Sequence, residues 1–231
     1  MNHSRNSSLV ISLGGSLIVP GGVNTSFIVE FVEIIKKRAH SGVRFFIVAG
    51  GGKTARLYGE AVLALGDHMT HNDADWIGIH TTRLNAEFLR IAFADLAYSM
   101  ICIDPENPPL SKQPVVIGAG WRPGASTDRV AVTLAEHVGA SRVINMSNIA
   151  YVYSEDPKEN ANAKKFESLT WSHYRSLIPK EWIPGLSSPF DPIASEQAEK
   201  IGLRVDVIDD SLSNIENCLD DVAFEGTIIM A

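Results

Sequence analysis

The sequence predicts an α/β protein, specifically a three-layer αβα sandwich with a mainly parallel central sheet. Short continuous apolar runs alternate with segments in which apolar residues recur every three or four positions. Continuous apolar runs are typical of strands buried on both faces, and the longer spacing is typical of amphipathic helices. The order strand, helix, strand, helix forms βαβ units, which favour parallel pairing and right-handed crossovers. Because the alternation continues throughout, we expect a single domain over residues 1–231.

The composition limits the classes of function. The 231 residues are 45% hydrophobic, which is enough for a substantial core. A net charge of −7 argues against nonspecific binding to nucleic acid or to an anionic membrane, because either requires a basic face. Cys102 and Cys218 lack metal-ligand spacing and are expected to be reduced core residues, and no segment approaches the ~18 continuous apolar residues of a membrane span. We therefore expect a cytoplasmic protein.

Two predicted strands each end in a glycine turn. The first strand, residues 9–13, ends at Gly14-Gly15-Ser16, and an amphipathic helix follows over about 24–38. The second strand, about 43–48, ends at Gly50-Gly51-Gly52, with Lys53 and Arg56 in the helix-compatible segment that comes next. Each turn is either a plain tight turn or a phosphate loop. Unpaired N–H groups at the start of a helix favour an anion, and parallel strands end at one edge, so we expect both turns to face one crevice.

A long helix is predicted from about Asp73 to Leu96. Beside its apolar face it carries a polar set within three turns, comprising Asp75, Thr82, Arg83 and Asn85. This set is either a solvated face or one wall of the ligand crevice.

The next predicted strand, residues 115–118, leads into a Gly- and Pro-rich loop that ends at Ser126, Thr127 and Asp128. These three residues stand where a helix N-cap belongs, before a new apolar pattern. Capping requires only one of them, so the loop as a whole is a candidate ligand contact.

A further strand, about 142–146, is followed by polar and aromatic residues that include Ser147, Asn148, Tyr153, Asp156 and Pro157. This segment fits either a purine ring and its ribose or an ordinary capped loop. The rest of the chain predicts helices over 167–178, 191–201 and 212–220, with strands over 205–208 and 226–230 that close the sheet. The seven histidines offer no metal-ligand pattern, so we predict no metal held by protein side chains.

Taken together, the motifs resemble the amino acid kinase superfamily and, within it, the archaeal-type uridylate (UMP) kinases. The resemblance covers nearly the whole chain. It rests on six motifs in the family's order, namely 13–16, 50–56, 75–86, 123–128, 147–157 and 191–194, with Gly226-Thr227 similar to the terminal strand.

The resemblance implies transfer of the ATP γ-phosphoryl group to UMP, giving UDP, with Mg²⁺ bridging the ATP phosphates. It implies catalytic positions at Lys53, Gly14, Gly15, Gly51 and Asp128. It implies substrate contacts at Gly52, Arg56, Asp75, Thr82, Ser126 and Thr127. It implies ATP contacts at Ser16, Ser147, Asn148, Tyr153, Asp156 and Pro157. It also implies an acceptor and phosphate lobe over about 8–140, an ATP lobe over about 141–231, and a homo-oligomer that reaches a hexamer in the family.

Two positions depart from the family pattern. Ala150 stands where close relatives usually carry Asp, and Glu196 stands where they tend to have Lys. Either the Glu196 side chain points away from the polyphosphate or ATP binding is altered. Two alternatives therefore remain: a non-catalytic nucleotide- or oxyanion-binding or storage homologue, and a kinase of this fold with another phosphate acceptor.

Overall fold

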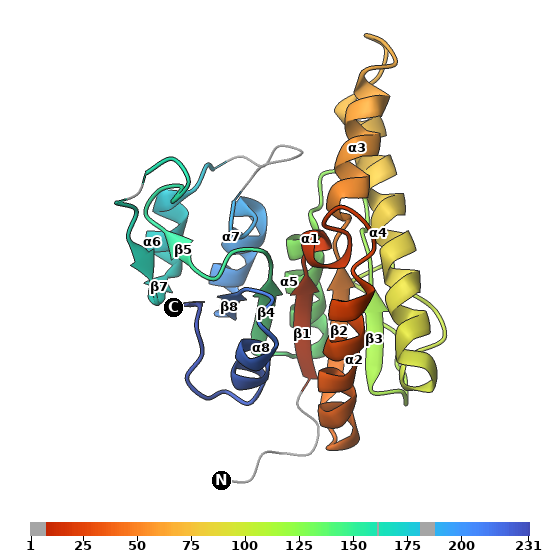
Figure 1. Cartoon of the computed structure of the whole chain (residues 1–231), viewed down its shortest axis with the longest axis vertical. Coiled ribbons are helices and arrows are strands. Elements are labelled where there is room, and N and C mark those ends of the chain that lie inside the picture. The colour runs from red at the N-terminus through yellow and green to blue at the C-terminus, as the bar shows by residue number, and fades with distance from the viewer. Residues whose placement is uncertain (1–7, 161, 181–187) are drawn as a thin grey trace.

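The computed structural model describes residues 8–160, 162–180 and 188–231 (Figure 1). Its main sheet has seven strands in the order β3-β2-β1-β4-β8-β9-β7. The bounds are β1 Ser8–Leu13, β2 Arg44–Ala49, β3 Val115–Gly118, β4 Arg142–Met146, β7 Ser168–Thr170, β8 Arg204–Ile208 and β9 Thr227–Met230. All neighbouring pairs are parallel except β8 and β9. The predicted mainly parallel sheet is confirmed.

Helices cover both faces of this sheet. One layer contains α1 (Gly15–Ile18), α2 (Thr25–His40), α4 (His71–Phe93) and α8 (Leu212–Leu219), and the other contains α5 (Thr127–Val138), α6 (Trp171–Leu177) and α7 (Pro192–Lys200). Successive residues of β1 supply both cores, since Val10 packs with the α5 layer and Ile11 with the α2 layer. The predicted αβα sandwich is therefore confirmed.

The sheet register brings three strand ends to one edge. Leu13 at the end of β1 lies opposite Ala49 of β2 and Met146 of β4. Because these strands are parallel, the loops that follow them leave the sheet side by side. From this edge α3 (Gly52–Leu63) and the first turns of α4 project beyond the body of the molecule (Figure 1).

The long helix α4 begins at His71, two residues before the predicted start. Thr70 caps it, because the Thr70 side chain accepts from the Asp73 N–H while the Asp73 side chain accepts from the Thr70 N–H. The helix ends at Phe93, earlier than predicted, because Ala94 adopts a positive φ of 51° and a short 3₁₀ turn, Ala94–Leu96, follows.

The C-terminal part departs from the sequence prediction at the sheet edge. The helix predicted over 167–178 begins only at Trp171, where the Thr170 side chain caps α6. The residues before it form two short strands, β6 (Lys165–Phe166), which pairs with β5 (Val152–Tyr153), and β7. The edge strand is therefore β7, and β9 lies inside the sheet between β7 and β8. Strands of two or three residues are too short to reveal an alternating pattern.

Helices of the two halves also contact each other. The Arg38 guanidinium of α2 donates to both carboxylate oxygens of Asp220, with distances of 2.9 and 2.7 Å, just after α8. Bidentate pairs of this kind fix orientation as well as distance.

Across the described ranges, no helix combines the length and apolar character needed to cross a membrane.

Candidate active site

The two glycine turns lie against each other with main chain facing main chain. A Cβ atom added to Gly15 would lie 1.9 Å from the backbone nitrogen of Gly52. Gly52 has a φ of +67°, and a Cβ atom there would lie 2.4 Å from the carbonyl oxygen of Gly15. Real side chains do not occupy such distances, so only glycine permits this contact. We call residues 14–16 and 50–53 together the glycine cradle.

Several amide groups of the glycine cradle have no acceptor within the described part of the chain. The N–H groups of Gly14, Gly50 and Lys53 donate to the carbonyls of Met146, Leu13 and Val19, at 2.8, 2.9 and 3.0 Å. Among the described residues no acceptor is found for the N–H groups of Gly15, Ser16, Gly51 and Gly52. Buried amides almost always have a partner, and Gly15 and Gly52 are buried. Donors without an acceptor among the described residues, at the starts of two helices, are the arrangement that favours an anion.

Positive charge stands beside these donors. Lys53 and Arg56 lie in the first two turns of α3, and both are exposed. No ion pair within the described ranges involves either residue. Both side chains are therefore exposed beside the cradle, and their contact with a phosphate stays a prediction.

Within the polar set on α4, Thr82 and Asn85 are buried and so do not form a solvated face. That this set is a wall of a ligand crevice stays a prediction. The Thr82 hydroxyl donates to Ile79 O and accepts from the Gly120 N–H, both at 2.7 Å. Because these bonds use its only proton and one lone pair, Thr82 anchors the loop before α5.

Asp75 also holds that loop. One of its carboxylate oxygens accepts from the Gly124 N–H at 3.0 Å. Arg83 donates to the carbonyl oxygens of Gly120 and Trp121 at 3.4 and 3.3 Å. Substrate contacts by Asp75 and Thr82 stay predictions, and their observed contacts are with this loop.

Asp128 lies at the junction of the two halves. Its carboxylate accepts from the Ser12 hydroxyl at 2.9 Å and from the Asp191 N–H at 3.1 Å. Burial, and then the nearby Asp191 carboxylate, raise the pKa of Asp128 to about 6. Burial also raises the pKa of Asp191, which caps α7 by accepting from the Ala194 N–H at 2.6 Å. Asp128 therefore joins β1, α5 and α7 through one carboxylate.

The residues around Asp128 divide into a cap and a helix start. Ser126 is the N-cap of α5, because its side chain accepts from the Arg129 N–H at 3.1 Å. Thr127 is the first residue of α5 and is half-buried.

Ser12, whose hydroxyl donates to Asp128, was not among the predicted site residues. Its signal was present as the one polar residue in the apolar run 9–13, where a buried hydroxyl needs a partner.

The predicted nucleotide side is more open. The Ser147 N–H donates to Ile208 O at 3.0 Å, and the Ser147 hydroxyl accepts from the Ile149 N–H at 3.3 Å. Asn148 and Pro157 are exposed, and exposed Asp156 accepts from the Lys158 N–H at 2.8 Å in a tight turn.

The aromatic part of this segment forms a small cluster. The rings of Tyr151 and Tyr153 meet edge to face, with centroids 6.5 Å apart. The Lys165 ammonium lies 4.3 Å from the centre of the Tyr151 ring. Ser147 lies beside the cradle in space: the carbonyl of Met146 before it accepts from the Gly14 N–H, and a Cβ atom added to Gly14 would lie 3.4 Å from Ser147 Cα.

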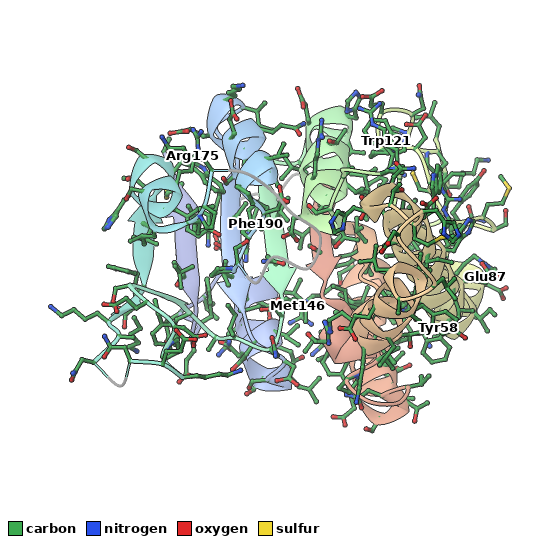
Figure 2. The ribbon with its side chains drawn as sticks, turned by 90° about the horizontal axis from the view of Figure 1, so that it is seen from above. Tyr58, Glu87, Trp121, Met146, Arg175 and Phe190 are labelled. Carbon is green, nitrogen blue, oxygen red and sulfur yellow. The ribbon has the colours of Figure 1, made fainter. Side chains whose placement is uncertain are left out.

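Glu196 lies on the side of α7 that faces α6. Its carboxylate pairs with Lys200 at 2.8 Å and approaches the Arg175 guanidinium at 4.0 Å. Figure 2 looks onto the molecule from above and places Arg175 on the far side of Phe190 from Trp121. The charge of Glu196 is thus neutralised by neighbouring cations on its own side of the helix.

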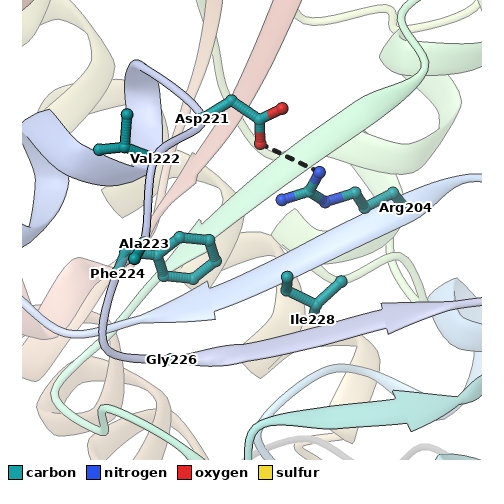
Figure 3. Close-up of a pocket in the computed structure, with 7 residues that line it drawn as sticks. All are labelled: Arg204, Asp221, Val222, Ala223, Phe224, Gly226 and Ile228. Atoms are coloured by element: carbon teal, nitrogen blue, oxygen red, sulfur yellow. Dashed lines mark ion pairs between the residues drawn. The ribbon is translucent and has the colours of Figure 1, made fainter.

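Two hollows lie away from the glycine cradle. One, of about 270 Å³, is lined by Phe224, Ile228 and the Arg204–Asp221 ion pair (Figure 3). The other, of about 510 Å³, lies between α6 and α7 beside Arg175. Neither contains a predicted site residue. The cradle remains the candidate site, because donors without an acceptor among the described residues are a more specific sign of a ligand than an empty volume is.

Comparisons with known proteins identify the family of the chain. Residues 7–209 match the amino acid kinase family. The chain is 37% identical to a uridylate kinase of Methanocorpusculum labreanum, with 96% of this chain and 94% of that protein covered. It is 34% identical to a uridylate kinase of Methanocaldococcus jannaschii, with 96% and 98% covered.

Solved structures show the same relationship. The uridylate kinase of Archaeoglobus fulgidus superposes with a TM-score of 0.82 at 34% identity, covering 96% of this chain and 99% of that one. An aspartate kinase from Synechocystis shares the fold, with a TM-score of 0.74 at 16% identity and 97% and 40% coverage. The chain belongs to the amino acid kinase family.

Proposed function

We propose that this protein transfers the γ-phosphoryl group of ATP to UMP. The observation that carries the proposal is the glycine cradle, in which four unpaired amides from two strand ends meet beside Lys53. Relatives that match along nearly the whole chain are named uridylate kinases, which supports UMP as the acceptor.

The geometry supports a mechanism of positioning and charge neutralisation. Phosphoryl transfer requires little covalent chemistry from the protein, because charge develops on the equatorial oxygens of the transferring group. In our proposal the amides of Gly15, Gly51 and Gly52 donate to these oxygens, and Lys53 supplies a full positive charge. Fixed donors of this kind need no reorganisation during the reaction, and one such donor is typically worth about 2.7–4 kcal/mol.

The acceptor and donor nucleotides occupy opposite sides of the cradle in this proposal. Arg56 and Asp75 hold UMP within the lobe formed by about 8–140, and Thr127 lies near the junction. ATP lies over the lobe formed by about 141–231. Its proposed contacts are Ser16, Ser147, Asn148, Tyr153, Asp156 and Pro157.

Magnesium enters the proposal with ATP. Within the described ranges no group of three His, Cys, Asp or Glu side chains is arranged to hold a metal ion. We propose that Mg²⁺ is held chiefly by the ATP phosphates, whose charge it neutralises. The protein itself then supplies the cradle amides and Lys53 as contacts for the phosphates.

We also propose that the protein is a cytoplasmic homo-oligomer that binds no nucleic acid. The α4 helix supports assembly, because Trp76, Leu84 and Ile91 are 41, 66 and 63% exposed. Their spacing places them along one helix face. Light scattering should give a mass that is a multiple of 25.1 kDa, and Leu84→Glu should lower it. A wild-type mass of one chain would contradict assembly.

The acceptor is tested by ADP release from ATP and Mg²⁺ with UMP, CMP, dTMP and isopentenyl phosphate offered separately. We expect turnover that depends on UMP. Turnover with isopentenyl phosphate alone would assign another acceptor. If none of the four acceptors gives ADP release, but ATP still raises the melting temperature of the folded protein, the result would instead indicate a binding or storage protein.

A further inference from the structure

Asn85 of α4 lies directly behind the second glycine turn. Its side chain is 6% exposed, and its amide nitrogen donates to two successive carbonyl oxygens, Gly50 O at 2.8 Å and Gly51 O at 3.2 Å. A carboxamide nitrogen has two N–H bonds, so this contact uses both of them. One side chain of α4 thus forms hydrogen bonds with two consecutive peptide groups.

The direction of these carbonyls fixes the direction of the amides that follow them. In a planar trans peptide the C=O bond and the next residue's N–H bond point in opposite directions. Holding Gly50 O and Gly51 O toward Asn85 therefore turns the N–H groups of Gly51 and Gly52 away from α4. These are two of the four cradle amides that find no acceptor among the described residues.

The amides on either side of this pair are already engaged. The Gly50 N–H donates to Leu13 O and the Lys53 N–H donates to Val19 O. With no Cβ at residues 50–52, these glycine peptides have more conformational freedom than any others, and a free turn would sample several orientations. A buried donor to both carbonyls restricts that freedom at the two positions where donors are left unpaired.

We propose that Asn85 is a positioning residue for phosphoryl transfer, acting through the Gly51 and Gly52 amides rather than by touching substrate. The inference rests on the proposed kinase function. Preorganised donors lower the barrier because they need not reorient as charge develops. Loss of Asn85 should therefore reduce kcat more than it raises the KM for UMP.

The test compares Asn85→Leu, which keeps the approximate shape but has no donor, with wild type in UMP-dependent ADP release. We expect kcat to fall ~10- to 100-fold, less than the ~100- to 1000-fold loss of a whole transition-state donor, because the amides remain but are no longer held. The KM for UMP should change by less than a factor of ~3.

The matched control is Thr81→Val, one helical turn away in α4. Thr81 is 8% exposed and its hydroxyl donates only to Ile77 O, at 2.9 Å. This variant removes a buried hydrogen bond of the same helix without reaching the cradle, so kcat should stay within a factor of ~2. Equal kcat in Asn85→Leu and Thr81→Val would overturn the assignment.

Two further measurements keep the result interpretable. If Asn85→Leu does not fold, Asn85→Ser retains one hydroxyl donor and should show an intermediate kcat, whereas wild-type kcat there would overturn the proposal. If wild type shows no turnover with UMP, the proposed function fails on its own. The Asn85 role is then tested by thermal stabilisation with inorganic triphosphate, which should be smaller in Asn85→Leu than in Thr81→Val. Equal stabilisation would contradict it.

Discussion

The glycine cradle and the predicted nucleotide side, residues 147–157, are built in different ways. The cradle is made of main chain, and its two turns approach so closely that a Cβ on Gly15 would meet the backbone at 1.9 Å. Apart from the short strand β5, the predicted nucleotide side is made of half-buried and exposed residues in loops and turns, such as Asp156, whose side chain accepts from the Lys158 N–H. Ala150, one of the two departures from the family pattern, lies in the second region.

This difference separates what the fold requires from what the chain can vary. A backbone-to-backbone contact leaves no room for substitution, because any side chain must displace a strand end. An exposed turn can exchange a side chain with little effect on the fold. We therefore expect substitutions at the closely packed glycines of the cradle to affect folding and turnover together, and substitutions on the predicted nucleotide side to affect ATP affinity alone.

The largest effect should come from Gly15→Ala. The added methyl group would overlap the Gly52 backbone, so we expect a loss of about 3 kcal/mol in the free energy of unfolding. UMP-dependent turnover should fall at least ~100-fold because the amides separate. Gly21→Ala is the control, since a Cβ there meets nothing within 4 Å. Equal stability of the two variants in urea would contradict the close approach.

Asp128→Asn should give the next largest effect, and it depends on pH. The pKa of Asp128 is raised to about 6 in the folded protein, above the ~4 expected when unfolded. Folding therefore favours the protonated acid, so the stability that this group contributes is present below about pH 4 and lost as the pH rises through 6. The neutral amide of Asn does not titrate. We compare the free energies of unfolding of the two proteins. The value for wild type minus the value for Asp128→Asn should fall by about 3 kcal/mol between pH 4 and pH 8.

The control for this titration is Asp156→Asn on the nucleotide side. Asp156 is exposed, so its replacement should change the free energy of unfolding by less than about 0.5 kcal/mol at either pH. A difference between wild type and Asp128→Asn that is flat with pH would show that folding does not raise the pKa of Asp128.

The smallest effect should come from Ala150→Asp. Ala150 is half-buried in the loop before β5, so a carboxylate there should leave the free energy of unfolding within about 0.5 kcal/mol of wild type. It should lower the KM for ATP by no more than ~5-fold, because a partly solvated polar contact is worth at most about 1 kcal/mol. A large gain in turnover with UMP would instead mean that residues 147–157 limit the turnover rate, which would contradict the contrast between the two regions.

The sequence was informative where local pattern and local structure coincide. The strand ends with their glycine turns and the helix cap region at Ser126 were recognisable, because each is defined by a few adjacent residues. The contact of Ser12 with Asp128 spans 116 positions, and no local pattern reports it. The burial of Thr82 and Asn85 likewise depends on the loops packed against α4, so periodicity left both readings open. The three-residue strand β7 exists only because β9 lies beside it.

The most direct test of the account is to compare wild type and Lys53→Ala in UMP-dependent ADP release. Lys53 is exposed at the start of α3, so the melting temperature should not change. If Lys53 stabilises the transferring group, wild type should turn over UMP and the variant should be slower by ~100- to 1000-fold. Equal turnover in the two proteins would remove Lys53 from the mechanism and contradict the glycine cradle as the place of phosphoryl transfer.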